Sequence, residues 1–129
     1  MHASGTFEVK LAPQPAAAGI EAAKLGRMTI DKQFHGELEA HSLGEMLAAG
    51  TEVAGSAGYV AIERVTGTLH GRGGSFVLQH SGTMQRGEAQ LSVSVVPDSG
   101  TGELAGLSGR MTIEIVPGEH RYQFDYNLA

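Results

Sequence analysis

The stretch Gly73–Met84, GGSFVLQHSGTM, has the pattern of a central β-strand. Its alternation places Phe76, Leu78, His80 and Met84 on one face and polar side chains mostly on the other. A histidine in register with Phe, Leu and Met is either a core residue with satisfied ring nitrogens or part of a pocket. The fold and the candidate site therefore both depend on what surrounds this strand.

The rest of the chain repeats the same period-two alternation in short segments. Further strands are predicted over residues 6–11, 27–35, 36–47, 58–69, 88–96, 103–116 and 121–128. Residues 42–50, SLGEMLAAG, have a short helix as their alternative interpretation. The prolines at 13 and 15 end the first strand, so residues 13–26 are predicted to be a partly mobile connection with at most one weak helical turn.

Seven or eight strands joined mostly by short turns are typical of a barrel or a sandwich. The 19 glycines, without a tandem repeat, suit the tight turns, bulges and corners of such a fold. About eight strands is the size at which a closed barrel just holds side chains or one small ligand. We therefore predict a single all-β domain over residues 1–129, an antiparallel β-barrel of about eight strands.

Composition excludes several classes of function. The chain has no cysteine, so disulfides, thiolate catalysis and Cys-zinc sites are ruled out. Its formal net charge is −5 and no basic run occurs, so nucleic acid is not an expected partner. No apolar run approaches the ~20 residues that span a bilayer, and the start does not resemble a secretory signal. A cytoplasmic protein without a membrane partner is the expectation.

Four segments carry a family resemblance. In order they are SGTFEVK, YVAIERVTGTLHGRGGSFVLQHSGT, VVPDSGTGELAGLSG and YQFDYNL, and together they resemble the bacterial DUF3224 proteins, a family without an assigned function. The resemblance implies a small antiparallel β-barrel similar to allene oxide cyclase. The segment DSGTGELAGLSGRMTIEI is also similar to the glycine-rich segment of allene oxide cyclases and dirigent proteins, which use an apolar barrel interior to steer ring closure or coupling. A ligand-holding barrel is thereby implied, but no reaction is carried over, because fold and function separate easily.

Glu63 is the first candidate catalytic residue. It shares a strand face with Tyr59, Ala61 and Val65. If that face is the inner one, burial is expected to raise the pKa of Glu63, which would suit general acid or base work. The alternative is a glutamate that pairs with an arginine or lies in water at the barrel mouth. The sequence does not fix which face is inner.

His80 is the second candidate. The turn at residues 70–74 suggests that the strands of Glu63 and His80 are adjacent and antiparallel, with both residues at comparable heights. The pair is therefore predicted to form a catalytic or ligand-polarising dyad. The alternative is a histidine that is only part of the core.

Further residues are predicted to line a ligand cavity. Tyrosines could supply phenol donors to an otherwise apolar pocket, and apolar side chains could form its wall. The alternative is that each simply fills the core. The candidates are Tyr59, Phe76, Leu78, Met84, Tyr122 and Tyr126, with Phe7 and Phe124 as further wall residues.

Metal and nucleotide sites find little support. His35, Glu37, Glu39 and His41 share one face, but the two histidines would lie about 20 Å apart at ~3.3 Å per residue, too far for one ion. The glycine-rich GRGG and GTGELAG lack the contexts of a phosphate or dinucleotide loop. Ser81 lies within a strand and outside any GxSxG motif. No metal and no cofactor are expected.

The predicted function is that of a barrel that binds a small hydrophobic molecule. Glu63 and His80 would make it a cofactor-independent isomerase, cyclase or proton-transfer enzyme. The alternatives are a carrier without chemistry and a structural barrel filled by side chains. Apolar residues on both faces of 58–69 also predict a homo-oligomer, with dimer and trimer both left open.

Overall fold

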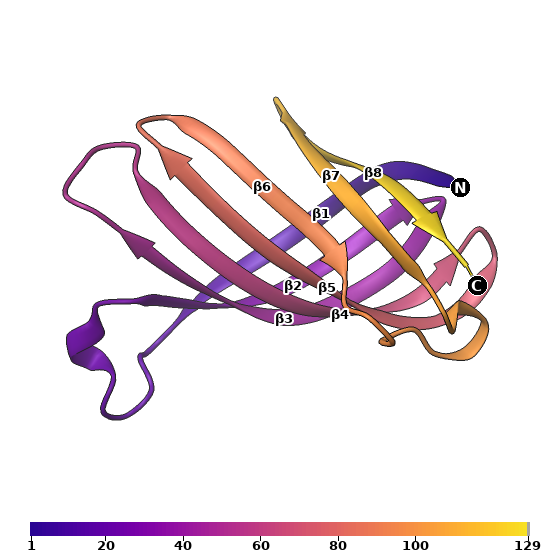
Figure 1. The fold of residues 1–129 in the computed structure, drawn as a ribbon, viewed down its shortest axis with the longest axis horizontal. Coiled ribbons are helices and arrows are strands. Elements are labelled where there is room, and N and C mark those ends of the chain that lie inside the picture. Colours follow the sequence, from indigo (N-terminus) through magenta and orange to yellow (C-terminus); the bar gives the residue numbers. More distant parts are fainter. Residues whose placement is uncertain (129) are drawn as a thin grey trace.

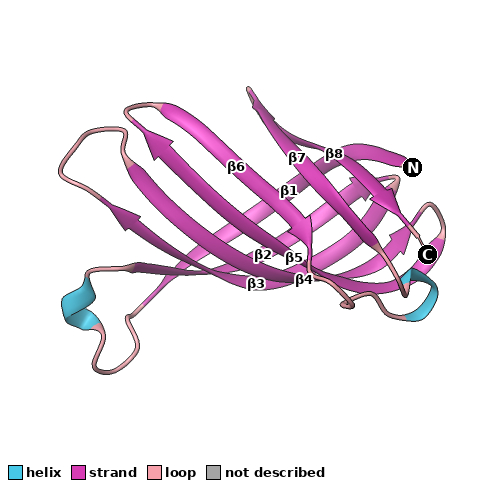
Figure 2. Ribbon diagram, viewed as in Figure 1, coloured by secondary structure: helices cyan, strands magenta, loops and turns pink. Residues whose placement is uncertain are grey.

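The computed structural model describes residues 1–128, and strands make up most of them (Figures 1 and 2). The strands are β1 (His2–Gln14), β2 (Gly26–Gly36), β3 (Leu38–Gly50), β4 (Ala57–Leu69), β5 (Arg72–Gln85), β6 (Glu88–Val95), β7 (Ser108–Val116) and β8 (Glu119–Asn127). Two short 3-10 turns, η1 (Glu21–Ala23) and η2 (Gly102–Leu104), lie in the connections. None of the helical segments in the described part of the chain is long and apolar enough to cross a membrane.

Each strand pairs antiparallel with its neighbour in sequence, and β8 returns to pair with β1. The result is a closed barrel with the order β1-β2-β3-β4-β5-β6-β7-β8. The predicted all-β antiparallel barrel of about eight strands is therefore confirmed. Residues 42–50 belong to strand β3 and not to a helix, because their inward residues continue the register of Leu38 and Ala40.

Several strand boundaries differ from the prediction, and two of the differences have a clear physical reason. β1 continues through Pro13, along a stretch where it pairs with β2 alone because its ladder with β8 ends at Phe7. A proline is tolerated on such an edge. β7 begins at Ser108 and not near residue 103, because η2 and the following turn carry Leu104 and Leu107 into the end of the barrel. Those two side chains are 1% and 3% exposed and close that end.

One half of the barrel interior is filled by side chains. Aromatic rings pack there edge to face, as in Phe34 with Tyr122 at 5.5 Å, or stacked, as in Phe76 with Phe124 at 5.8 Å. This is the half nearest both chain ends, on the right in Figure 1. Its buried cluster comprises Ala3, Phe7, Phe34, Leu38, Ala40, Val65, Leu69, Phe76, Leu78, Val93, Val95, Leu104, Leu107, Met111, Tyr122, Phe124 and Tyr126.

The other half of the interior is open. Four large apolar side chains continue the inward-facing rows of their strands in this half and are nevertheless exposed. They are Leu11 (48%), Met84 (43%), Leu91 (45%) and Ile115 (73%). Met84 and Leu91 line a cavity at this end of the barrel. β6 and β7 pair at only two positions, so the tip of the β7–β8 hairpin stands clear of the neighbouring strands at the top of Figure 1. The candidate site lies beside this open half of the barrel interior.

Candidate functional site

Four polar side chains meet inside the barrel, one from each of four consecutive strands. They are Lys32 on β2, Ser42 on β3, Glu63 on β4 and His80 on β5, and we call them the polar cluster. None is more than 5% exposed. The inner face of β4 is therefore the face of Glu63, the choice that the sequence left open. Polar groups this deeply buried are costly unless they are paired with each other.

Glu63 is the centre of the polar cluster. Its Oε2 accepts hydrogen bonds from Lys32 Nζ at 2.8 Å and from His80 Nε2 at 2.6 Å, and its Oε1 accepts one from Ser42 Oγ at 2.7 Å. The register of β4 and β5 explains the contact between Glu63 and His80. Ala61 lies directly opposite His80, so Glu63, two residues further along β4, is the diagonal neighbour of His80. The predicted contact between Glu63 and His80 is confirmed.

The surroundings allow these groups to converge. Gly44 lies opposite Glu63, and a Cβ at Gly44 would collide with the Glu63 backbone and Cβ. The missing side chain therefore lets β3 and β4 approach closely beside the carboxylate. The ammonium group of Lys32 lies 4.8 Å from the ring centre of Phe7 and 5.3 Å from that of Phe34. Both ring faces stabilise the buried cation.

Glu63 is held as a carboxylate. Burial on its own raises the pKa of Glu63, but the hydrogen bond from His80 and the charges of Lys32 and His80 outweigh burial and lower the pKa from 4.5 to about 2. The raised pKa expected from the sequence is therefore wrong, because that expectation lacked Lys32. At neutral pH Glu63 is therefore a carboxylate that accepts hydrogen bonds from its three partners and balances the charge of Lys32.

His80 keeps one ring nitrogen free. Its Nε2 contacts Glu63, whereas Nδ1 has no hydrogen-bond partner among residues 1–128. Within the described chain, every fully buried side-chain nitrogen or oxygen has a hydrogen-bond partner. Because Nδ1 has none, it is not fully buried. With Nε2 assigned as the protonated nitrogen, Nδ1 is a hydrogen-bond acceptor and a base.

An apolar cavity of about 600 Å³ lies at the open end of the barrel, one inward-facing row beyond His80, and no residue of the polar cluster lines it. Its wall includes Tyr59 and Met84, two of the residues predicted to bind a ligand, together with Met46, Ala48 and Leu91. Tyr59 pairs with Gly82, and its ring lies where a side chain at position 82 would be. This pair is the next inward-facing row after Ala61 and His80. Burial, and secondly the charge of Glu63, raise the pKa of Tyr59, so its hydroxyl remains a donor.

The other predicted cavity residues lie in the filled half. Phe76, Leu78, Tyr122 and Tyr126 are at most 3% exposed and belong to the packed core, as do Phe7 and Phe124. The Tyr122 hydroxyl accepts the Leu38 N–H at 2.9 Å and lies 3.0 Å and 3.1 Å from the carbonyl oxygens of His35 and Leu38. It fixes the β2–β3 turn and does not face the cavity.

The family is identified by comparison with known proteins. The family model described as "Protein of unknown function (DUF3224)" matches residues 3–126. The chain belongs to the DUF3224 family. It is also similar to a crystal structure of a DUF3224 protein of unknown function from Shewanella oneidensis MR-1, with 55% identity and a TM-score of 0.92 over 100% of this chain and 97% of that one. No curated protein matches the chain. These findings confirm the family predicted from the sequence and assign no activity.

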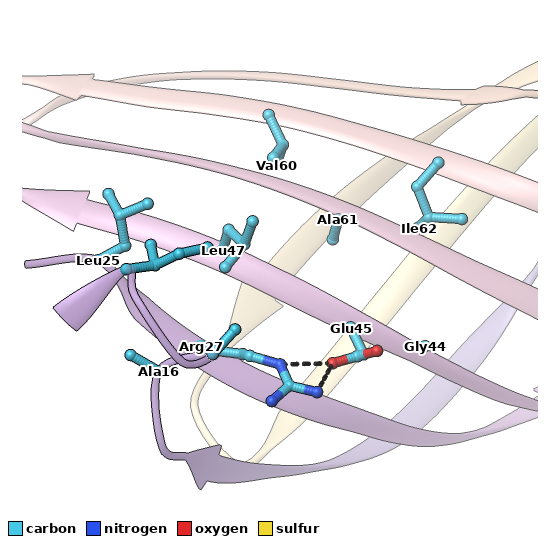
Figure 3. A pocket seen from close by; sticks show the side chains of 11 residues that line it. Ala16, Leu25, Arg27, Gly44, Glu45, Leu47, Val60, Ala61 and Ile62 are labelled. Carbon is cyan, nitrogen blue, oxygen red and sulfur yellow. Dashed lines mark hydrogen bonds and ion pairs between the residues drawn. The ribbon is translucent and has the colours of Figure 1, made fainter. Parts of the chain in front are cut away.

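The DUF3224 chain has a second cavity, outside the barrel. It measures about 730 Å³ and lies between residues 16–25 and the outer face of β3 and β4 (Figure 3). Apolar side chains such as Leu47, Val60 and Ile62 line it, and Figure 3 shows the ion pair of Arg27 with Glu45, at 2.7 Å, along one side. This groove lies on the outer face of β3 and β4, whereas the interior cavity lies on the face that carries the polar cluster, so the interior cavity is the better candidate despite its smaller volume.

No group of three or more metal-ligating His, Cys, Asp or Glu side chains is assembled within residues 1–128 of this DUF3224 protein. The histidines of the row 35–41 are engaged in surface pairs instead. His35 contacts Glu8 at 3.0 Å, and His41 contacts Asp31 at 2.6 Å. The predicted single row is wrong, because β2 ends at Gly36 and β3 begins at Leu38, so His35 and His41 lie on neighbouring paired strands.

Sequence reasoning missed Lys32 and Ser42. The signal for Lys32 was present, because it alternates in register with the apolar Met28, Ile30 and Phe34 just as His80 does with its neighbours. Ser42 carried no such signal, since a small hydroxyl residue is common on either face of a strand. Its place in the cluster depends on the β3–β4 register.

Proposed function

We propose that this DUF3224 protein binds a small apolar molecule in the open half of its barrel and exchanges a proton with it through His80. The observation that supports this proposal most is the buried contact between His80 and Glu63 at 2.6 Å, one inward-facing row from the apolar cavity. A deep cavity with few convergent polar groups is the usual form of a small-molecule site. His80, paired with Glu63, supplies a base that can exchange a proton with a bound molecule.

The proposed chemistry is proton transfer at a carbon next to a carbonyl group. His80 Nδ1 removes a proton from that carbon, and the electron pair of the broken C–H bond moves onto the carbonyl oxygen to give an enolate. The Tyr59 hydroxyl donates a hydrogen bond to this oxygen. Returning the proton from His80 to another carbon completes an isomerisation without a cofactor. Glu63 stabilises the imidazolium while it exists, and Lys32 balances the charge of Glu63.

The test is carbon-bound hydrogen exchange. A β,γ-unsaturated ketone is incubated with the protein in D₂O, and NMR follows both deuterium incorporation next to the carbonyl and conversion to the conjugated isomer. We expect His80→Gln to lower both rates by about 10²- to 10⁴-fold, the usual contribution of a general base. Gln79→Ala, on the outward-facing neighbour of His80, is the matched control and is expected to keep the rates.

Two results distinguish a proton-transfer enzyme from a carrier barrel. Equal rates in the wild type and in His80→Gln would overturn the proton-transfer role of His80. Ligand binding without any exchange would leave a carrier barrel as the function. Binding itself is measured with Nile red, a neutral apolar fluorophore that brightens in apolar surroundings.

A further inference from the structure

The polar cluster has a charge balance that bears on the ligand. Lys32 is the one lysine or arginine among the described residues that is buried, and its single anionic contact is Glu63 at 2.8 Å. Both side chains are almost fully enclosed, at 6% and 0% exposure. The cation is therefore already neutralised inside the protein, and the rings of Phe7 and Phe34 lie beside it.

The cavity wall adds no charge. Among the residues that line it there is no Asp, Glu, Lys, Arg or His. Its polar side chains are hydroxyls and one amide, of which Tyr59 stands beside the row of His80. A carboxylate brought into this cavity would lose its hydration and gain no free cation, which is costly. A carbonyl or hydroxyl group needs only one or two hydrogen bonds.

The shape of the open half favours an elongated molecule. From His80 to Met84 the inner face of β5 runs four residues, which is about 13 Å at ~3.3 Å per residue. Gly82, between them, has no side chain, and the ring of Tyr59 lies over it as part of the wall. Leu91 on β6 and Leu11 on β1 extend the apolar wall at this end of the barrel.

We propose that the site selects elongated apolar molecules that end in a neutral oxygen group, a ketone or an alcohol, and rejects the corresponding carboxylates, with Glu63 as the residue that sets this preference. Glu63 does so by neutralising Lys32 and not by touching the ligand. The inference deepens the proposed function and rests on its binding step, but not on its proton transfer.

The test compares three ligands of equal chain length. Dodecan-2-one, dodecanol and dodecanoate each displace Nile red from the protein at pH 8, where histidine side chains are ordinarily neutral. We expect the wild type to bind the ketone and the alcohol about tenfold or more tightly than the carboxylate. In Glu63→Gln, Lys32 is a free buried cation, so dodecanoate gains affinity by about tenfold or more and the order reverses.

A double variant guards against misfolding of the single one. Lys32→Met with Glu63→Gln removes both charges at similar volume, an exchange that is often well tolerated. It is expected to keep the preference of the wild type for neutral ligands. A gain for dodecanoate in the double variant would overturn the role given to Lys32.

The outcomes for this inference and for the proposed function differ. If the wild type binds dodecanoate as tightly as the ketone, the selectivity is refuted while ligand binding stands. If none of the three compounds displaces Nile red, the binding step fails and this inference fails with it. If the ketone binds selectively but no deuterium exchange occurs, the selectivity stands and the catalytic role of His80 falls.

Discussion

Protonating Glu63 should remove a large part of the stability of this barrel. The pKa of Glu63 is about 2 in the folded protein against an ordinary value of 4.5. Because the folded-state pKa is the lower one, the ionised carboxylate stabilises the fold above pH 4.5, and this contribution is lost as the pH falls toward 2. A difference of this size corresponds to roughly 3 kcal/mol of unfolding free energy.

The assay is urea unfolding of the wild type and of Glu63→Gln at a series of pH values from 7 down to 2. The glutamine variant lacks the titrating group, so the advantage of the wild type should shrink by roughly 3 kcal/mol across the acid range. Glu45→Gln is the matched control, since Glu45 is exposed and its surface pair with Arg27 is worth at most about 1 kcal/mol. A wild-type advantage that stays constant from pH 5 to pH 2 would refute the assignment of Glu63 as the charged centre.

Three further predictions concern the cavity, the filled half and the outer face. Ala48→Phe places a ring in the cavity and is expected to abolish Nile red binding with little change in melting temperature, whereas retained binding would move the ligand elsewhere. Tyr122→Phe leaves the buried Leu38 N–H without its partner and should cost about 1–3 kcal/mol in urea unfolding without changing ligand affinity. The exposed apolar outer face of β3 and β4 is expected to mediate a dimer or trimer. Light scattering should show Ile62→Lys as a monomer, while Thr112→Lys, on the distant outer face of β7, keeps the assembly.

The sequence predicted well which face of a strand each residue occupies, but it predicted poorly how far along the barrel axis that residue lies. The turn at 70–74 was sufficient to predict that the strands of Glu63 and His80 are adjacent and antiparallel, with both residues at comparable heights, whereas the hydrogen bond between them required the actual register. Alternation does not say how far along the barrel axis a residue lies. Phe76 and Tyr122 were therefore predicted at the cavity although they fill the opposite half.

The position of the filled half depends on contacts distant in sequence. Leu104 and Leu107 close that end only because η2 folds back against β5, and the pattern of residues 103–116 suggested an uninterrupted strand. The charge state of Glu63 also could not be predicted from the sequence. Burial and a nearby cation change a pKa in opposite directions, and the outcome requires knowing that Lys32 reaches the same carboxylate oxygen as His80.

The short ladder between β6 and β7 has a consequence for how this barrel can come apart. Val93–Met111 and Ser94–Arg110 are the pairs that join the two strands, whereas β4 and β5 pair over their whole length. Few backbone hydrogen bonds oppose separation there, so we expect this seam to open before the others. An opened ring is a curled sheet with two bare edges, onto which another strand can add. The β7–β8 hairpin of one molecule would then close the sheet of a second, and domain swapping becomes a route to assembly that requires no new surface.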